Sequence, residues 1–136
     1  MDSDHSGDQI NQRVDIQQIG SQFVNFFFTS SSQNLENLIS SGIIKKHTRI
    51  KYQNKEFKGE ELVNLLIQLN SNLIFSIEET ITIDSGGRRA DIMVIGKAQH
   101  KIQTDKMYRF SQYFTIANNK ENWFLHNSLL SILDYL

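Results

Sequence analysis

Four histidines are the side chains in this chain best suited to bind a metal ion or to move a proton near neutral pH. They are His5, His47, His100 and His126. No two of them stand three or four residues apart, the spacing that lets one helix face present a pair of metal ligands. The sequence also contains no cysteine, which removes thiolate zinc sites and cysteine nucleophiles. We therefore expect no metal site and no cofactor.

Carboxyl, phenol and amide groups could still support acid–base chemistry inside an apolar pocket. The inward-facing candidates are Tyr52, Asp84, Tyr108, Gln112 and Asp134. Asp84 belongs to a turn, where Asp is common because its side chain bonds the local backbone. No two candidates stand at a spacing that defines an acid–base pair, and no phosphate-binding glycine loop or nucleophile motif is present. The sequence therefore predicts a non-enzymatic protein without catalytic residues.

Composition limits the remaining classes. A chain of 136 residues is long enough for one domain with its own core. The formal net charge of −1 gives no overall field that would recruit nucleic acid, so we expect no strong direct nucleic-acid binding. Residues 1–12 are polar and acidic, unlike a secretory signal, and no apolar run is long enough for a membrane span. We expect a soluble intracellular protein without a membrane partner.

Periodic apolar residues predict three helices in the first half of the chain. Residues 1–12 lack such a pattern and are expected to form a disordered tail, which leaves residues 13–136 as the folded domain. A first helix is expected over 13–29, with an aromatic stripe toward the core that includes Phe26. A short second helix is expected after Asn34 as its cap, with Ile39 inward, and a third over 60–70.

Alternating apolar residues predict strands in the second half. The ranges are 47–53 before the third helix, then 73–83, 90–102, 107–117 and 123–133, separated by turns. Helices that precede a bent antiparallel sheet indicate the α+β class, with three helices packed on a curved antiparallel sheet in the shape of a cone.

The last two of these strands carry apolar side chains on both alternating faces. In 107–117, Phe110 and Phe114 share one parity and Tyr113 has the other. Because side chains alternate along a strand, two apolar parities mean two faces to bury. The expected helices can cover only one of them. The pattern therefore indicates that the second face docks a partner protein.

Several segments resemble the nuclear transport factor 2-like family. The first helix contains Gly20-Ser-Gln-Phe23-Val24, which resembles the opening G-x-x-F-V pattern of that family, and residues 50–63 resemble its strand, tight turn, short strand and third helix. Phe110-Ser-Gln-Tyr-Phe114 resembles its F-x-Q-x-F strand, and Trp123 stands where a tryptophan commonly opens the last strand. The resemblance covers about residues 16–136. It implies the cone-shaped fold and a role in transport.

Two branches of this family remain open as expectations. One contains the export proteins that pair with the matching domain of a larger mRNA export receptor and support passage through nuclear pores lined by FG-repeat proteins. The other contains homodimeric carriers that import GDP-bound Ran. The Ran contact of the family corresponds here to Tyr52, Gln53 and Asp105, and the uncharged Gln53 favours the export branch. A small-molecule isomerase or dehydratase of the same fold is a more remote alternative.

The resemblance also implies where and how the chain associates. By strand parity the expected partner surface contains Arg109, Ser111, Tyr113, His126, Ser128, Leu130 and Ile132. Which parity faces outward depends on the register, because a shift of one residue exchanges the two faces. A nuclear and cytoplasmic location, at the nuclear envelope and pore, is expected for either branch.

Overall fold

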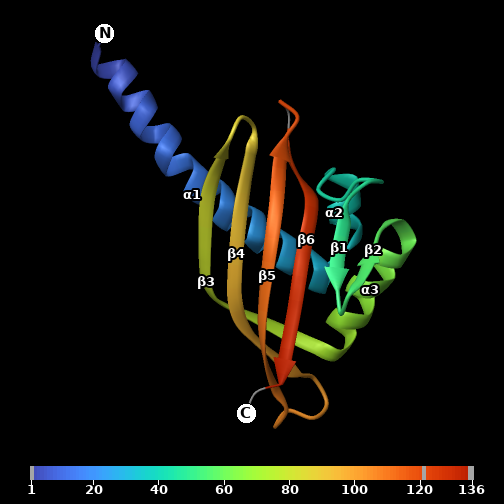
Figure 1. The fold of residues 1–136 in the computed structure, drawn as a ribbon. Helices are drawn as coiled ribbons and strands as arrows, with labels where there is room; N and C mark the ends of the chain where they lie inside the picture. The colour runs from blue at the N-terminus through green and yellow to red at the C-terminus, as the bar shows by residue number, and fades with distance from the viewer. Residues whose placement is uncertain (1, 121, 135–136) are drawn as a thin grey trace.

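A computed structural model describes the backbone of residues 2–120 and 122–134 and the side chains of residues 16–120 and 122–133. It contains three helices and six strands in these residues (Figure 1). The helices are α1 (Asp2–Gln33), α2 (Glu36–Ser40) and α3 (Gly59–Asn72). The strands are β1 (Arg49–Tyr52), β2 (Lys55–Phe57), β3 (Leu73–Gly86), β4 (Arg89–His100), β5 (Met107–Asn118) and β6 (Trp123–Asp134). None of the described helices could span a membrane.

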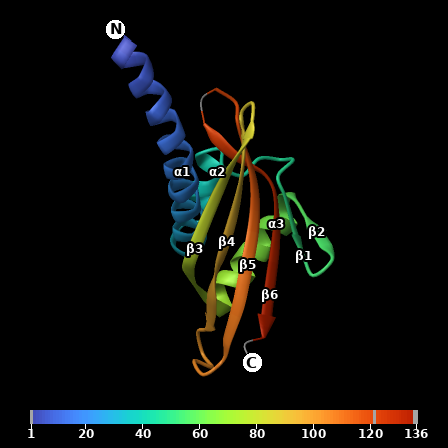
Figure 2. The ribbon, with the colours of Figure 1, turned by 60° about the vertical axis from the view of Figure 1, so that its left-hand side comes forward.

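One six-stranded sheet organises the chain, in the order β2-β1-β6-β5-β4-β3. The four long strands form an antiparallel meander and β1 pairs with β2 in a hairpin, as expected. The pairing of β1 with β6 is parallel, so the sheet is mixed and not purely antiparallel. Parallel neighbours need a long connection, and the rest of the chain from α3 to β5 supplies it. The long strands are visibly curved in Figure 2.

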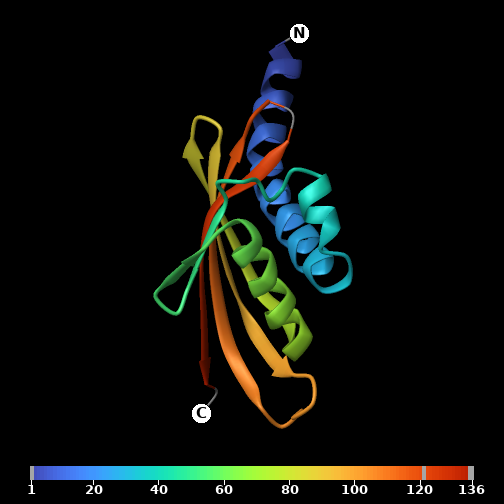
Figure 3. The ribbon, with the colours of Figure 1, turned by 90° about the vertical axis from the view of Figure 1, so that its right-hand side faces the viewer.

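All three helices lie on one side of this sheet, and the other side carries none (Figure 3). The covered side holds the core, in which aromatic rings from α1 meet rings from the strands. Phe27 packs edge-on against Phe114 with ring centroids 5.2 Å apart, and Phe75 packs against Phe110 at 5.0 Å. Phe28 contacts the same three strand rings. The predicted α+β fold with three helices on a curved sheet is confirmed.

A close contact fixes where α1 crosses the sheet. A β-carbon at Gly20 would overlap Thr82 Oγ1 and lie 2.9 Å from Thr82 Cβ, so only glycine lets the helix approach β3 this closely. One turn earlier, Gln17 Nε2 donates a hydrogen bond of 2.8 Å to the Thr82 carbonyl oxygen. The glycine of the first-helix motif therefore has a packing role, and it places Phe23 and Phe27 over the middle of the sheet.

Two helical expectations are corrected. Phe26 is 40% exposed because it falls outside the helix arc centred on Gly20 and Val24, and Val24 takes its place in the core. α2 begins at Glu36 with Leu35 at the N-cap position and no side-chain cap, so Asn34 does not cap it. Ile39 is 41% exposed and does not face inward.

The first helix starts earlier than its periodicity predicts, at Asp2 and not near residue 13. The acidic residues of its first turns suit the positive end of a helix dipole, and no proline interrupts the segment. Figure 1 shows these turns projecting beyond the sheet. The side chains before Ile16 are not described, so the division into a tail over residues 1–12 and a folded domain over residues 13–136 stays a prediction.

An extra residue in β6 reverses the facing of its side chains. Thr115 pairs with Asn127 whereas the next β5 residue, Ile116, pairs with Leu125, so His126 has no partner across the ladder. Such a bulge moves every later residue to the opposite face. Leu125 faces the core before the bulge, and Leu130 faces it afterwards although the two differ in parity.

We expect Gly20→Ala to destabilise the domain by about 1–3 kcal/mol, because the new methyl group must displace β-branched Thr82 or lift α1 from β3. This cost exceeds the gain of about 1 kcal/mol in helix propensity. The measurement is urea unfolding followed by circular dichroism. Ser21→Ala, at an exposed neighbouring position, is the control and should change the free energy of unfolding by less than about 0.5 kcal/mol. Equal effects of the two changes would contradict the packing role of Gly20.

Candidate interaction surface

The side of the sheet without helices carries a row of apolar side chains that runs across four strands. Cross-strand register places Ile81 beside Met93, Met93 beside Tyr113, and Tyr113 beside Leu129. We call this side the open face and these four residues the central row. Ile81 is 44% exposed and Leu129 is 53% exposed. Side chains this large and this exposed in adjacent positions are typical of a surface that a partner covers.

Further apolar residues extend the open face beyond the central row. Ile83 and Leu133 are among the most exposed large apolar side chains that the structure describes, and Ile95 lies next to Met93 on the same strand face. Arg49 and Lys51 border this area at the β1 edge, and Glu78 and Glu79 border it at the β3 edge. An apolar centre with a charged rim is the usual layout of a protein–protein interface.

The predicted partner surface divides into two groups. Arg109, Ser111 and Tyr113 lie on the open face, since the alternate residues of β5 between them are buried. The prediction for the last strand was wrong: Ser128 and Leu130 are buried on the helix-covered side, and Ile132 packs against the core.

The bulge explains this error. Simple alternation from Leu125 places residues 128, 130 and 132 outward, but the unpaired His126 exchanges the faces beyond it. His126 itself is half-buried beside His47 at the β1–β6 border. The residues that take the outward positions are Asn127, Leu129, Ser131 and Leu133.

Sequence reasoning also missed the contribution of β3 and β4. The alternation pattern places four exposed residues of these strands in the sheet but not in the partner surface: Ile81, Ile83, Met93 and Ile95. The available signal was the alternation of Ile81 and Ile83 with threonines, which places isoleucine on one face and Thr82 on the other. Thr82 is buried against α1, so the isoleucines must face outward.

A polar cluster centred on Asp91 lies beside the central row. Ser85 Oγ and Thr115 Oγ1 donate hydrogen bonds to the two carboxylate oxygens, the second at 3.0 Å, and the Tyr113 hydroxyl donates another. The Ser85 hydrogen bond is the main reason that the pKa of Asp91 lies below its ordinary value. Burial, followed by the bond to Asp91, raises the pKa of Tyr113. Asp91 is therefore held as a carboxylate beside the apolar central row.

The residues of the possible Ran-type contact lie at one end of the sheet. Tyr52 and Gln53 line a polar pocket of about 540 Å³, which His100 and Tyr108 also line, and burial raises the pKa of Tyr52. Gln53 has a φ of 53°, so it occupies a left-handed position of the β1–β2 turn that a long side chain seldom adopts. Asp105 is in the exposed loop that follows His100. No contact among these three side chains is seen in the described residues.

The interior between the sheet and α1 is filled, whereas the pocket of about 540 Å³ lies between α3 and the end of the sheet. The space among Phe27, Phe28, Phe75 and Gln112 has a volume of only about 10 Å³, which is about the limit for one water molecule. Buried Gln112 Nε2 donates a hydrogen bond of 2.9 Å to Ser128 Oγ. The Ser128 hydroxyl in turn donates one of 2.8 Å to the Tyr113 carbonyl oxygen. The Gln112 amide and the Ser128 hydroxyl thus bond to groups of the sheet itself, so this pair supports packing, and Ser31 Oγ in the lining of the same space has no hydrogen-bond partner among the described residues.

The remaining candidates for chemistry do not form a cluster among the described residues. Asp84 Oδ1 accepts a hydrogen bond of 2.9 Å from the Gly86 amide, the local turn bond that was expected. His100 Nδ1 accepts hydrogen bonds from the amides of residues 102 and 103. The described part of the chain holds no group of three metal-binding side chains. The side chains of His5 and Asp134 lie outside the described residues.

We expect the stability of the domain to fall in acid partly through Asp91. Its folded pKa is lower than its unfolded value of about 3.9, so its contribution is complete above that value and is lost as pH falls through the folded pKa. Asp91→Asn should therefore lower stability at about pH 6 but have a smaller effect at about pH 3. Urea unfolding at both pH values checks this, with Asp84→Asn as control. An effect of Asp91→Asn that is independent of pH would contradict it.

Solved structures share this arrangement, although no family model and no curated protein sequence matches the chain significantly. Nuclear transport factor 2 from Cryptosporidium parvum has a TM-score of 0.72 at 21% identity, and the match covers 86% of this chain and 94% of that one. Yeast Bre5, a protein associated with Ubp3, has a TM-score of 0.70 at 15% identity, with coverages of 88% and 98%.

Bre5 is also known in a complex with the deubiquitinase Ubp3. A candidate scytalone dehydratase from Novosphingobium aromaticivorans has a TM-score of 0.73 at 9% identity, with coverages of 93% and 92%. At such low identities these similarities establish the fold alone. The chain has the nuclear transport factor 2-like fold, an α+β architecture shared by transport factors, partner-binding proteins and enzyme-like proteins.

Proposed function

We propose that this chain is a non-enzymatic transport subunit that acts by pairing its open face with a second nuclear transport factor 2-like domain. The observation that carries the proposal is the central row, four large side chains in register on the side of the sheet that has no helices. In the form that we favour, the partner is the matching domain of a larger mRNA export receptor. The pair then supports passage of messenger RNA through nuclear pores.

The scale of the open face suits a stable interface. A permanent complex of this kind buries about 2,000 Å² or more in total. The open face spans the four long strands, each of twelve residues or more, and presents apolar groups from each. Burial of this area would also enclose Asp91. A carboxylate that loses water on binding needs a cationic or donating group opposite it, so we infer that the partner domain presents such a group near Asp91.

The packed interior favours association over chemistry. The polar side chains buried there are neutral hydroxyl and amide groups, and none of the described buried residues is an acid, a base or a histidine. A general acid or base held in an apolar cavity is the usual requirement for catalysis in such an interior. Phe27, Phe28 and Phe110 fill the interior beneath α1 with aromatic rings.

The choice between export subunit and Ran carrier depends on charge. Recognition of cationic side chains requires carboxylates, but position 53 carries an amide and Asp105 stands between Lys101 and Lys106. This supports the export receptor as partner and makes import of GDP-bound Ran by a homodimer the alternative. The likeness to a nuclear transport factor 2 at 21% identity supports that alternative. Contact with FG-repeat pore proteins, and a location in nucleus and cytoplasm, belong to both forms of the proposal.

An isomerase or dehydratase activity is the remote alternative, supported by the pocket of about 540 Å³ with Tyr52, His100 and Tyr108 in its lining and by the likeness to a candidate dehydratase. It predicts turnover of a small molecule that Tyr52→Phe reduces without loss of folding. Under the transport proposal Tyr52→Phe leaves partner binding unchanged.

The identity of the partner is tested by purifying the tagged chain from cells that make it and determining the native mass of the complex. A companion of larger mass that contains a nuclear transport factor 2-like domain supports the export role. A complex of two copies with Ran·GDP supports the alternative. A monomer that binds neither rules out both forms of the transport proposal.

We expect Leu129→Asp to weaken pairing by about 3 kcal/mol or more, which is over a hundredfold in Kd, because it buries an unpaired charge in the interface. Leu129 is 53% exposed in the single chain, so the folded domain should tolerate the change. Sedimentation of the purified complex measures pairing, and circular dichroism measures folding.

Ile67→Asp is the matched control, since Ile67 is 50% exposed on α3, on the helix side. It should leave pairing intact. If Leu129→Asp pairs as tightly as Ile67→Asp, the open face is not the interface.

A further inference from the structure

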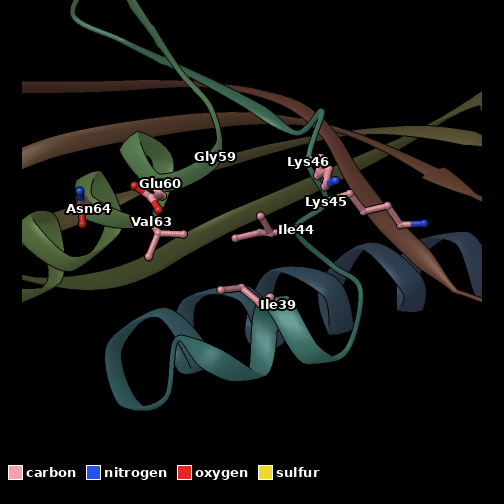
Figure 4. Close-up of a pocket in the computed structure, with 8 residues that line it drawn as sticks. All are labelled: Ile39, Ile44, Lys45, Lys46, Gly59, Glu60, Val63 and Asn64. Atoms are coloured by element: carbon pink, nitrogen blue, oxygen red, sulfur yellow. The ribbon is translucent and has the colours of Figure 1, made fainter.

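A groove between α2 and α3 lies on the helix side of the molecule, away from the open face. It has a volume of about 430 Å³. Figure 4 shows Ile39 from α2, Ile44 from the segment after it and Val63 from α3 pointing toward one another. These three aliphatic side chains form an apolar floor. Ile39 remains 41% exposed although it belongs to a helix that packs on the core.

The wall formed by the segment after α2 is held firmly to the sheet. The Leu125 amide donates a hydrogen bond of 2.8 Å to the Ile43 carbonyl oxygen. Buried Thr48 Oγ1 donates one of 2.6 Å to the Leu125 carbonyl oxygen. The backbone amide of Lys45 donates a hydrogen bond of 2.9 Å to the same Thr48 hydroxyl. These bonds tie both ends of the segment to β6, so the groove is preformed and its shape does not depend on a mobile loop.

The segment that contains this groove's lysines is rich in positive charge, although its Arg49 and Lys51 border the open face and only Lys45 and Lys46 line the groove. Six of the 14 lysines and arginines of the chain lie within fourteen residues. They are Lys45, Lys46, Arg49, Lys51, Lys55 and Lys58. Arg49 forms an ion pair of 3.5 Å with Glu56, and Lys55 forms one of 3.7 Å with Glu61.

The cations nearest the groove are not neutralised in this way. Among the described residues, Lys46 and Lys58 form no salt bridge. Lys46 lines the groove, and Lys58 directly precedes Gly59, which also lines it. Lys45 Nζ lies 4.3 Å from the centre of the Phe124 ring, and Figure 4 shows this side chain pointing away from the aliphatic floor, so Lys46 is the groove-lining lysine nearest the proposed anchor. Glu60 stands on the α3 wall, where its carboxylate can accept a backbone N–H.

We propose that this groove binds an acidic peptide segment of a partner protein by anchoring one bulky apolar side chain. The anchor packs on Ile39, Ile44 and Val63, and the acidic residues beside it face Lys46 and Lys58. An apolar centre within a charged rim is the layout of a peptide-binding site, and a groove between helices commonly accepts such anchors. The local surplus of lysines selects an acidic segment and disfavours a basic one.

The first test is methyl NMR of the folded chain with three synthetic peptides. One carries a single Phe between Asp and Glu residues, the second has Ala in place of Phe, and the third has Lys in place of the acids. We expect the first peptide to shift the methyl signals of Ile39, Ile44 and Val63 and not those of Ile83 and Leu129. No groove shift with the first peptide at millimolar concentration, or equal shifts with all three, overturns the proposal.

The second test uses variants. Ile39→Glu and Lys46→Glu should each reduce the affinity for the acidic Phe peptide by about tenfold or more. Ile67→Glu adds the same charge at an exposed isoleucine of α3 outside the groove and should leave the affinity unchanged. A polyuridine oligonucleotide is tested in parallel. If it shifts the groove signals and the acidic Phe peptide does not, the surface binds nucleic acid and the proposal is wrong.

Discussion

The close approach of α1 to β3 is the contact on which the rest of the structure depends. A long helix can lie across a curved sheet only where a side chain of each is small enough, and here Gly20 meets Thr82 without an intervening β-carbon. From that point Phe23 and Phe27 reach the middle of the sheet, and their rings contact Phe114. The aromatic cluster then fills the interior. The position of α1 and the filled interior beneath it are thus two results of one contact.

A filled interior changes what the fold can do. In this architecture the space under the helices and the bare side of the sheet are the two large surfaces available for function. The aromatic side chains of this chain fill the first beneath α1 and leave the pocket beside α3, and the second retains its apolar row. The hydrogen bonds of Gln112 and Ser128 near the interior are made within the chain. What remains available to another molecule is the open face, the groove beside α2 and the pocket between α3 and the end of the sheet.

Periodicity predicted the class of fold, because Ile16, Ile19, Phe23 and Phe27 recur every three or four residues, as on one helix face, whereas Phe110, Phe114 and Ile116 all share one alternating parity, as on one face of a strand. It located the long strands to within about three residues. It did not predict the parallel pairing of β1 with β6, which depends on contacts far apart in the sequence. It also assigned the wrong face to Leu130, because a bulge leaves no mark in an alternation pattern that has apolar residues on both sides. For the same reason, the facing of the partner-surface residues was predicted correctly for β5, which has no bulge, and incorrectly for β6, which has one.

The two edges of the sheet decide what kind of assembly an exposed apolar face can produce. A long flat edge strand invites other chains to add by backbone pairing and so to polymerise. Here β2 is only three residues long, and β3 is interrupted by an unpaired Glu78 whose carboxylate lies 3.7 Å from Lys97 Nζ. Growth along the sheet is therefore discouraged at both ends. When only the open face takes part in association, one partner covers the whole apolar surface. The result is a closed complex of fixed size and not a fibre.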